Sequence, residues 1–338
     1  MSFKRFDPQD IVVSAESITA PVWSSGATTL TAFFSSSAQV AGSSGAYYYN
    51  VYDLDPSGST AKIQFALAYG DIAGSGSVRF NSAVAGQSPS KTIYGQYRTQ
   101  VLGDEESNFI FGNQSGSHIF VINVDRARYK EKLLPGTLDL TLKNGGDILK
   151  LTDNSKVASS TIFTDAGRKF DLVSGSLGSV YTTVNQDGHS VNSGSYGMFL
   201  PDIGTIILNG KALDGTGTEG GINIATLRSD NTETSGSEKL FNALVEGESF
   251  KLNSEETISS NFVFVRARNA EFNYSSNPSN ITGSGELRHN VMINNPQAYT
   301  TSVGLYNDNN DLLAIAKLSR PLLKDFTKEA LVRIKLDF

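Results

Sequence analysis

Phe120-Val121-Ile122-Asn123-Val124-Asp125-Arg126-Ala127-Arg128 is an apolar, β-like run that ends in two arginines. Phe262-Val263-Phe264-Val265-Arg266-Ala267-Arg268 repeats this pattern later in the chain. Side chains alternate between the two faces of a strand, so each pair of arginines is expected to share one face. The two runs predict β structure with rigid surfaces that can dock carboxylates.

The composition supports a β-rich protein of more than one domain. The chain has 338 residues, which makes two domains the default expectation. Charged residues make up 18%, below the roughly 25% of ordinary globular proteins. The 32 glycines suit turns, and the 13 tyrosines and 19 phenylalanines favour strands.

Charge and residue types exclude several classes of function. The formal net charge of −6 disfavours a general nucleic-acid binder. The absence of cysteine excludes disulfides, zinc–thiolate sites, iron–sulfur clusters and cysteine nucleophiles. The sequence has no P-loop, no His-Glu-x-x-His and no Gly-x-Ser-x-Gly motif. We therefore predict no catalytic residue, no cofactor and no metal ligand, and we expect the protein not to be an enzyme.

Targeting signals are also missing from the sequence. The start of the chain lacks the apolar segment of a signal peptide, and no apolar stretch approaches the roughly 18 residues of a membrane helix. These features predict no membrane span. They favour a protein that is used in a cytoplasm or carried by a particle assembled there.

The expected elements are mostly short strands and hairpins. Ser88, Pro89 and Gly103 are typical of the two ends of a helix, and a second short helix is expected over 238–246. Hairpins are expected at 138–151 and at 302–318, and the alternation over 332–338 predicts a final strand.

Pro135-Gly136 marks the first expected domain boundary, because the sequence beyond it becomes richer in Gly, Ser, Thr and Asn. We predict a mainly β fold: a multi-domain antiparallel β platform with a β-rich inserted module and one or two short helices. In this interpretation residues 1–135 and 256–338 form two halves of the platform, and 136–255 form the module.

A cationic stripe follows the first apolar run, with basic residues at every second position. One interpretation is an edge strand protected from aggregation by its charges. A second is an electrostatic contact with acidic residues of a neighbouring subunit, and a third is phosphate binding. The candidate interface residues are Arg126, Arg128, Lys130, Lys132, Arg266, Arg268 and Tyr274.

Three segments resemble the virion structural proteins of contractile-tailed phages that infect marine cyanobacteria. They are Arg126–Lys132 with Leu134-Pro135-Gly136, then Arg266–Pro278, and then Val303–Asp308 with Leu313–Ser319. The resemblance implies a structural protein of the virion tail, with the baseplate favoured over the neck or the head. It also implies assembly in the host cytoplasm and contacts with other tail proteins and with copies of the same chain.

Two classes of function therefore stay open at the level of sequence. The first is a baseplate subunit that joins the hub and sheath to peripheral parts through lateral contacts. The second is a receptor- or carbohydrate-binding module that contacts the host surface through its Gly/Ser/Asn-rich loops.

Overall fold

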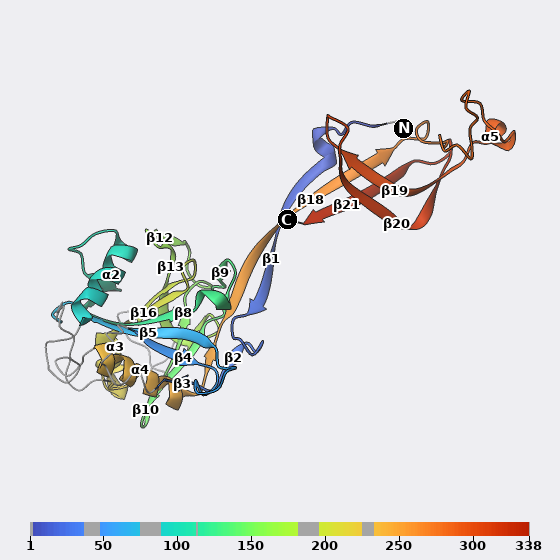
Figure 1. Cartoon of the computed structure of the whole chain (residues 1–338). Helices are drawn as coiled ribbons and strands as arrows, with labels where there is room; N and C mark the ends of the chain where they lie inside the picture. Colours follow the sequence, from blue (N-terminus) through green and yellow to red (C-terminus); the bar gives the residue numbers. More distant parts are fainter. Residues whose placement is uncertain are drawn as a thin grey trace. The chain divides into compact units, whose positions relative to one another are not determined.

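The computed structural model describes residues 3–36, 48–74, 89–112, 114–181, 196–224 and 233–337. The chain is mainly β, and every strand pair whose register is known is antiparallel, which confirms the expected fold class. It divides into two compact units (Figure 1). We call Ile18–Glu256 the sheet unit, and Met1–Ser17 with Thr257–Phe338 the terminal unit.

One large curled sheet forms the centre of the sheet unit. Its strand order is β2-β17-β10-β11-β13-β15-β16-β8-β5-β4-β3, and β12 and β14 each pair with β13. The strand bounds are β2 Thr29–Leu30, β3 Phe34–Ser35, β4 Tyr49–Tyr52, β5 Ile63–Asp71, β8 His118–Val124, β10 Asp139–Asn144, β11 Asp147–Asp153, β12 Ile162–Thr164, β13 Gly167–Ser176, β14 Ser179–Val180, β15 Gly197–Leu200, β16 Thr205–Asn209 and β17 Phe250–Lys251.

Both faces of this sheet are covered. On one face, Leu67 and Phe120 belong to a core that includes Leu240 and Leu244 of helix α4 (Glu233–Gly247). On the other, Val121 packs in a second core with residues of helix α2 (Ser90–Leu102) and of the hairpin β6 (Phe109–Phe111) and β7 (Gln114–Gly116). The central strands are therefore apolar at consecutive positions, whereas the alternation of Ile63, Phe65, Leu67 and Tyr69 in the sequence predicts one buried face only.

The two expected helices are present with shifted starts. α2 ends as expected, with Gly103 in the left-handed conformation and its N–H bonded to the carbonyl of Thr99. Pro89 is the N-cap of α2, and the expected cap Ser88 lies outside the described residues. α4 begins five residues before the expected segment. The sheet unit also contains α3 (Gly210–Asp214) and the 3-10 turns η2 (Arg126–Arg128) and η3 (Gly217–Glu219).

The terminal unit is built from long strands. β18 (Asn253–Ala267) pairs with β21 (Ala330–Asp337) over Ser260–Ala267, and β1 (Ile11–Pro21), after the turn η1 (Pro8–Asp10), is the neighbour of β18. The hairpin of β19 (Ala298–Tyr306) and β20 (Leu312–Lys324) packs its inner face on β18 and β21. The described part of this unit also contains the short helix α5 (Val291–Asn294). The expected hairpins at 138–151 and 302–318 and the final strand are thus confirmed.

The units divide the chain differently from the expected domains. β10, β11, β13 and β15 come from the expected inserted module, but they share one sheet with β5 and β8 from the expected first half. β16 pairs with β8 over five residues, and the two strands bury their side chains in the same two cores. Residues 136–255 are therefore part of the sheet unit instead of a module of their own. The change of unit after Glu256 lies one residue beyond the expected second boundary, between residues 255 and 256.

Candidate functional site

The first group of candidate residues lies in a turn and not on a strand. β8 ends at Val124, and the carboxylate of Asp125 accepts a hydrogen bond of 2.8 Å from the backbone N–H of Ala127. This cap begins the 3-10 turn η2, which contains Arg126 and Arg128. The prediction that these two arginines alternate along one strand face is therefore wrong.

Arg126 stabilises this turn from within. Its guanidinium donates hydrogen bonds to the backbone carbonyls of Tyr129 and Lys130, and it lies 4.7 Å from the ring centroid of Tyr129. Burial raises the pKa of the Tyr129 hydroxyl, and the nearby Arg126 charge opposes that rise. Arg126, which the sequence predicts to be a docking group for another subunit, thus makes its contacts within its own unit.

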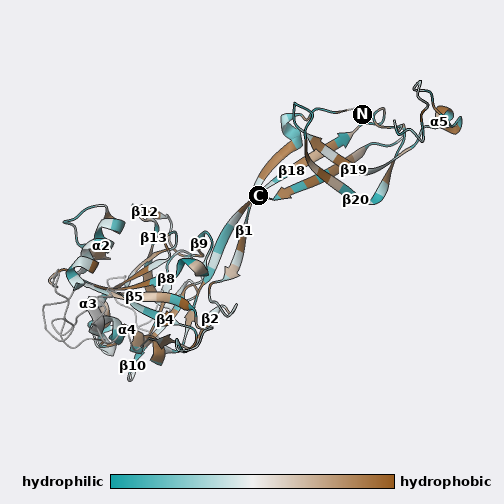
Figure 2. Cartoon of the chain, viewed as in Figure 1, coloured by the Kyte–Doolittle hydropathy of each residue, from teal (hydrophilic) through white to brown (hydrophobic). Residues whose placement is uncertain are grey.

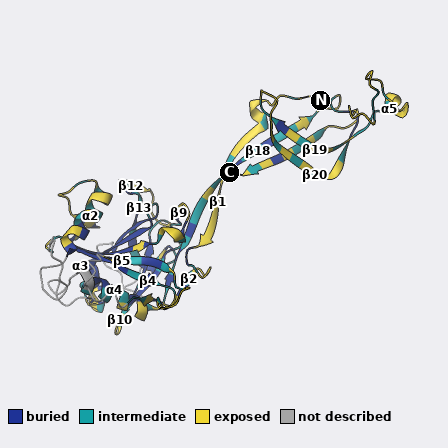
Figure 3. Cartoon of the chain, in the orientation of Figure 1, coloured by how far each residue is buried: buried dark blue, intermediate teal, exposed yellow. Residues whose placement is uncertain are grey.

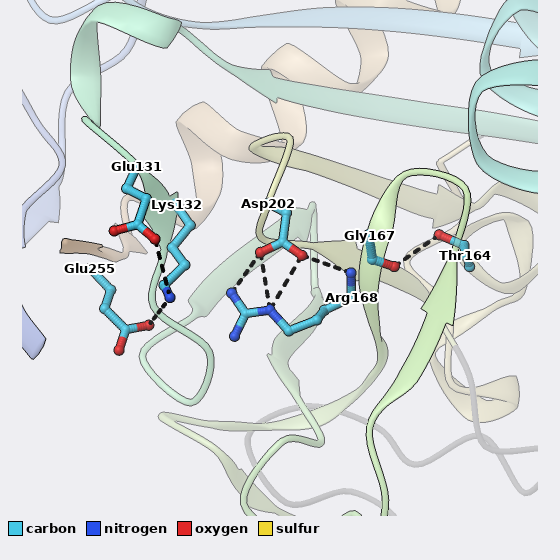
Figure 4. A network of polar contacts seen from close by, with 7 residues as sticks. All are labelled: Glu131, Lys132, Thr164, Gly167, Arg168, Asp202 and Glu255. Atoms are coloured by element: carbon cyan, nitrogen blue, oxygen red, sulfur yellow. Dashed lines mark hydrogen bonds and ion pairs between the residues drawn. The ribbon is translucent and has the colours of Figure 1, made fainter. Parts of the chain in front are cut away.

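The two lysines of the stripe find acidic partners on the same chain. Lys130 Nζ lies 2.9 Å from Glu256, and Lys132 Nζ lies 3.5 Å from Glu131 and 3.7 Å from Glu255 (Figure 4). β9 (Lys132–Leu133) pairs with the start of β18, which places Glu255 opposite Lys132. One interpretation of the sequence places the acidic partners of these lysines on a neighbouring subunit. In the structure, Glu255 and Glu256 of β18 in the same chain are such partners.

A stronger ion pair lies beside this group. Arg168 donates from Nη2 to Asp202 Oδ1 at 2.6 Å and from Nε at 3.0 Å, and its backbone N–H donates to Oδ2 at 2.8 Å (Figure 4). Burial by itself raises the pKa of Asp202, but the hydrogen bonds and the charge of Arg168 outweigh burial, so that this pKa lies below its usual value. The pair joins β13 to the β15–β16 turn.

The second group of candidates belongs to the terminal unit. Arg266 is exposed on β18, opposite Leu331 of β21, whereas Arg268 follows the end of that strand. The backbone N–H of Arg268 donates to Glu271, which also binds Lys4 at 3.0 Å. Tyr274 is 63% exposed. The two Arg-Ala-Arg segments thus lie in different units and in different kinds of local structure.

Exposed apolar side chains distinguish the terminal unit. In the described part of this unit, three apolar side chains are buried, namely Val263, Leu305 and Ile334. Fourteen of the twenty-four exposed large apolar side chains in the described chain belong to it, although it is much the smaller unit. Its strands carry apolar residues (Figure 2), yet most of them are exposed or half-buried (Figure 3). This surface is the strongest candidate for a functional site.

The fourteen exposed side chains come from every part of the terminal unit. They are Phe3, Phe6, Ile11, Val12, Val13, Tyr274, Val291, Ile293, Tyr299, Leu312, Leu313, Ile315, Phe326 and Leu331. Sequence reasoning named Tyr274 from this set and missed the others, because a strand alternates in the same way whether one face or neither is covered.

A buried polar cluster in the sheet unit was also missed. His118 Nε2 lies 2.8 Å from Asp214 Oδ2, and the imidazole packs beside the ring of Tyr69. Nearby Asn209 Oδ1 and Ser237 Oγ are buried without a hydrogen-bond partner in the described structure. This contact joins α3 to the start of β8. His118 and Asp214 are far apart in sequence, so no motif reveals this contact.

Small-molecule and metal sites have little support in the described residues. A shallow pocket of about 180 Å³ lies beside β12 and includes the ion pair of Lys169 and Asp171, at 3.3 Å. Ligand pockets usually enclose about 300–1,000 Å³. Within the described ranges no cluster of His, Asp and Glu has the arrangement of a metal site, and none of the helices is long and apolar enough to cross a membrane.

The chain matches no protein-family model, no curated protein and no solved structure.

Proposed function

We propose that this protein is a structural component of a contractile phage tail, a baseplate subunit that joins the hub and sheath to peripheral parts by lateral protein–protein contacts. The observation that carries this proposal is the apolar surface of the terminal unit. A large apolar side chain gains roughly 1.5–3 kcal/mol when it is fully buried. In its described part the unit buries three such side chains and exposes fourteen, so partners that cover it would stabilise it further.

The sheet unit supplies the other property that such a subunit needs. Its central strands are covered on both faces, and Phe65, Phe120 and Phe199 are completely buried. Close-packed interiors of this kind deform little under load. A rigid unit joined to a unit with many exposed apolar side chains is suited to a permanent assembly.

The resemblance to phage tail proteins also supports the terminal unit as the contact surface. Two of the three similar segments, Arg266–Pro278 and Val303–Asp308 with Leu313–Ser319, lie in the terminal unit. The second of these forms the β19–β20 hairpin, which carries Leu313 and Ile315. Both of these segments carry exposed apolar residues, since the first contains Tyr274.

Fractionation of infected cells tests this proposal. We expect the chain to sediment with purified tails and to remain bound after washing with high salt, because apolar contacts are not screened by ions. Tyr274→Ala and Tyr299→Ala together should reduce its incorporation, while the control Tyr48→Ala in the sheet unit should not. Recovery of the wild-type chain only outside particles would contradict the proposal, as would retention on host polysaccharide without incorporation.

A further inference from the structure

The terminal unit has two outer faces, which lie on opposite sides of its core. Val263 and Ile334 point into the core from β18 and β21, and Leu305 and Ala314 point into it from the hairpin. Because side chains alternate along strands, the residues between these positions point outward on each layer. One outer face therefore belongs to β18 and β21, and the other belongs to the β19–β20 hairpin.

The outer face of β18 and β21 is aromatic and cationic. Its cross-strand pairs are Phe262 with Lys335, Phe264 with Arg333, and Arg266 with Leu331. The guanidinium of Arg333 lies 5.5 Å from the ring centroid of Phe262. We call these six residues the basic face.

Two charges of the basic face have no acidic partner in the described structure. Lys335 is neutralised by Glu16 at 3.0 Å and by Asp337 at 3.3 Å. Arg266 and Arg333 form no ion pair within the part of the chain that is described. Leu331, opposite Arg266 and two residues before Arg333 on β21, is 60% exposed. The face thus presents two free guanidiniums around apolar surface, which is the arrangement that a carboxylate with apolar neighbours would match.

The outer face of the hairpin has that complementary chemistry. Leu312, Leu313 and Ile315 are 51%, 68% and 59% exposed, and the side chains of Tyr306 and Leu312 lie beside Gly304, which is opposite Ile315. The turn that closes the hairpin carries the exposed Asp308 and Asp311, and the exposed Lys317 follows Ile315 on the same side of β20. We call these six side chains and Gly304 the acidic face, because its carboxylates outnumber its one ammonium group. The side chain of Asn307 fixes the turn by accepting hydrogen bonds from the backbone N–H groups of Asn309 and Asp311.

We infer that the terminal unit mediates head-to-tail self-association, in which the acidic face of one copy docks on the basic face of the next. A second copy is the favoured occupant because this chain itself carries both complementary faces. Further copies of the same chain would then cover the apolar residues of both faces and neutralise Arg266 and Arg333. Contacts between unlike patches are heterologous, so they generate a closed ring or an open filament. This inference rests on the proposed function and specifies one of its partners.

Charge reversal in the full-length chain tests the contact. Arg266→Glu with Arg333→Glu reverses the two unpaired charges of the basic face, and Asp308→Lys with Asp311→Lys reverses the two carboxylates of the acidic face. Each variant should weaken self-association at least tenfold, which corresponds to about 1.4 kcal/mol, in sedimentation velocity. An equimolar mixture should restore association to near the wild-type level, because each unlike pair of copies again joins opposite charges.

The controls separate this contact from general effects. Lys91→Glu reverses an exposed charge in α2 of the sheet unit and should leave association unchanged. Leu313→Ser with Ile315→Ser should weaken association and should not be rescued by either charge variant. A mixture no better than the single variants, or a wild-type chain that stays monomeric at about 100 µM, would overturn the inference. If the monomeric chain is still found in purified tails, the proposed function stands and another protein covers these faces.

Discussion

At the scale of single residues, one side-chain hydrogen bond ends the strand that precedes Arg126. Residues 120–128 look like one continuous strand, but the side chain of Asp125 caps the backbone and starts a turn. An alternation of side chains contains no information on such a cap. The acidic partners of Lys130 and Lys132 were equally hidden, because β9 and β18 are distant in sequence.

The pair of Arg168 and Asp202 gives a prediction of pH dependence. Asp202→Asn should lower the free energy of unfolding by about 1–2 kcal/mol at pH 7, since a charge-assisted bidentate contact is lost. The pKa of Asp202 is lower in the folded than in the unfolded chain, so its contribution is complete above the unfolded pKa of about 4 and disappears as the pH falls through the folded pKa.

Urea unfolding of the sheet unit within the full chain, followed at pH 7 and at pH 2–3, measures this difference. The difference between the wild type and Asp202→Asn should be smaller at the acidic end than at pH 7. Glu105→Gln, which removes an exposed carboxylate without an ion pair in the described structure, should match the wild type at both pH values. An equal difference between wild type and Asp202→Asn at both would contradict the assignment.

At the scale of elements, the sequence was most informative where a short segment contains its own signals. The end of α2 at Gly103 and the two hairpins were predicted because capping and turn residues act locally. The second covered face of β5 was not predicted, because it depends on α2 and on the β6–β7 hairpin, whose packing involves distant residues.

Helix α2 offers a test of this local reasoning. Gly95 lies inside the helix, and a Cβ atom added there would meet no other atom within 4 Å. Gly95→Ala should therefore stabilise the sheet unit by about 0.5–1 kcal/mol through the higher helix propensity of alanine. The matched control Gly70→Ala should destabilise it, because the new Cβ would lie 2.8 Å from the backbone nitrogen of Tyr94. Thermal unfolding followed by circular dichroism compares the two, and a lower midpoint for Gly95→Ala would contradict this expectation.

At the scale of the whole molecule, the two units differ in how far each buries its own apolar residues. The mainly β class followed from composition and alternation, whereas the division into units did not. Residues 136–255 have the composition of a separate module, yet they complete a sheet begun by β5 and β8. Long-range strand pairing determines that outcome, and a single sequence does not reveal which strands pair.

The central claim is that partners cover the terminal unit in the assembled particle. Hydroxyl-radical footprinting with mass spectrometry, on the purified chain and on intact tails, measures this directly. The account predicts that Leu313, Ile315 and Leu331 are oxidised readily in the purified chain and strongly protected in tails, while exposed Tyr48 of the sheet unit serves as the internal reference. Equal oxidation of the three terminal-unit residues in both samples would contradict it.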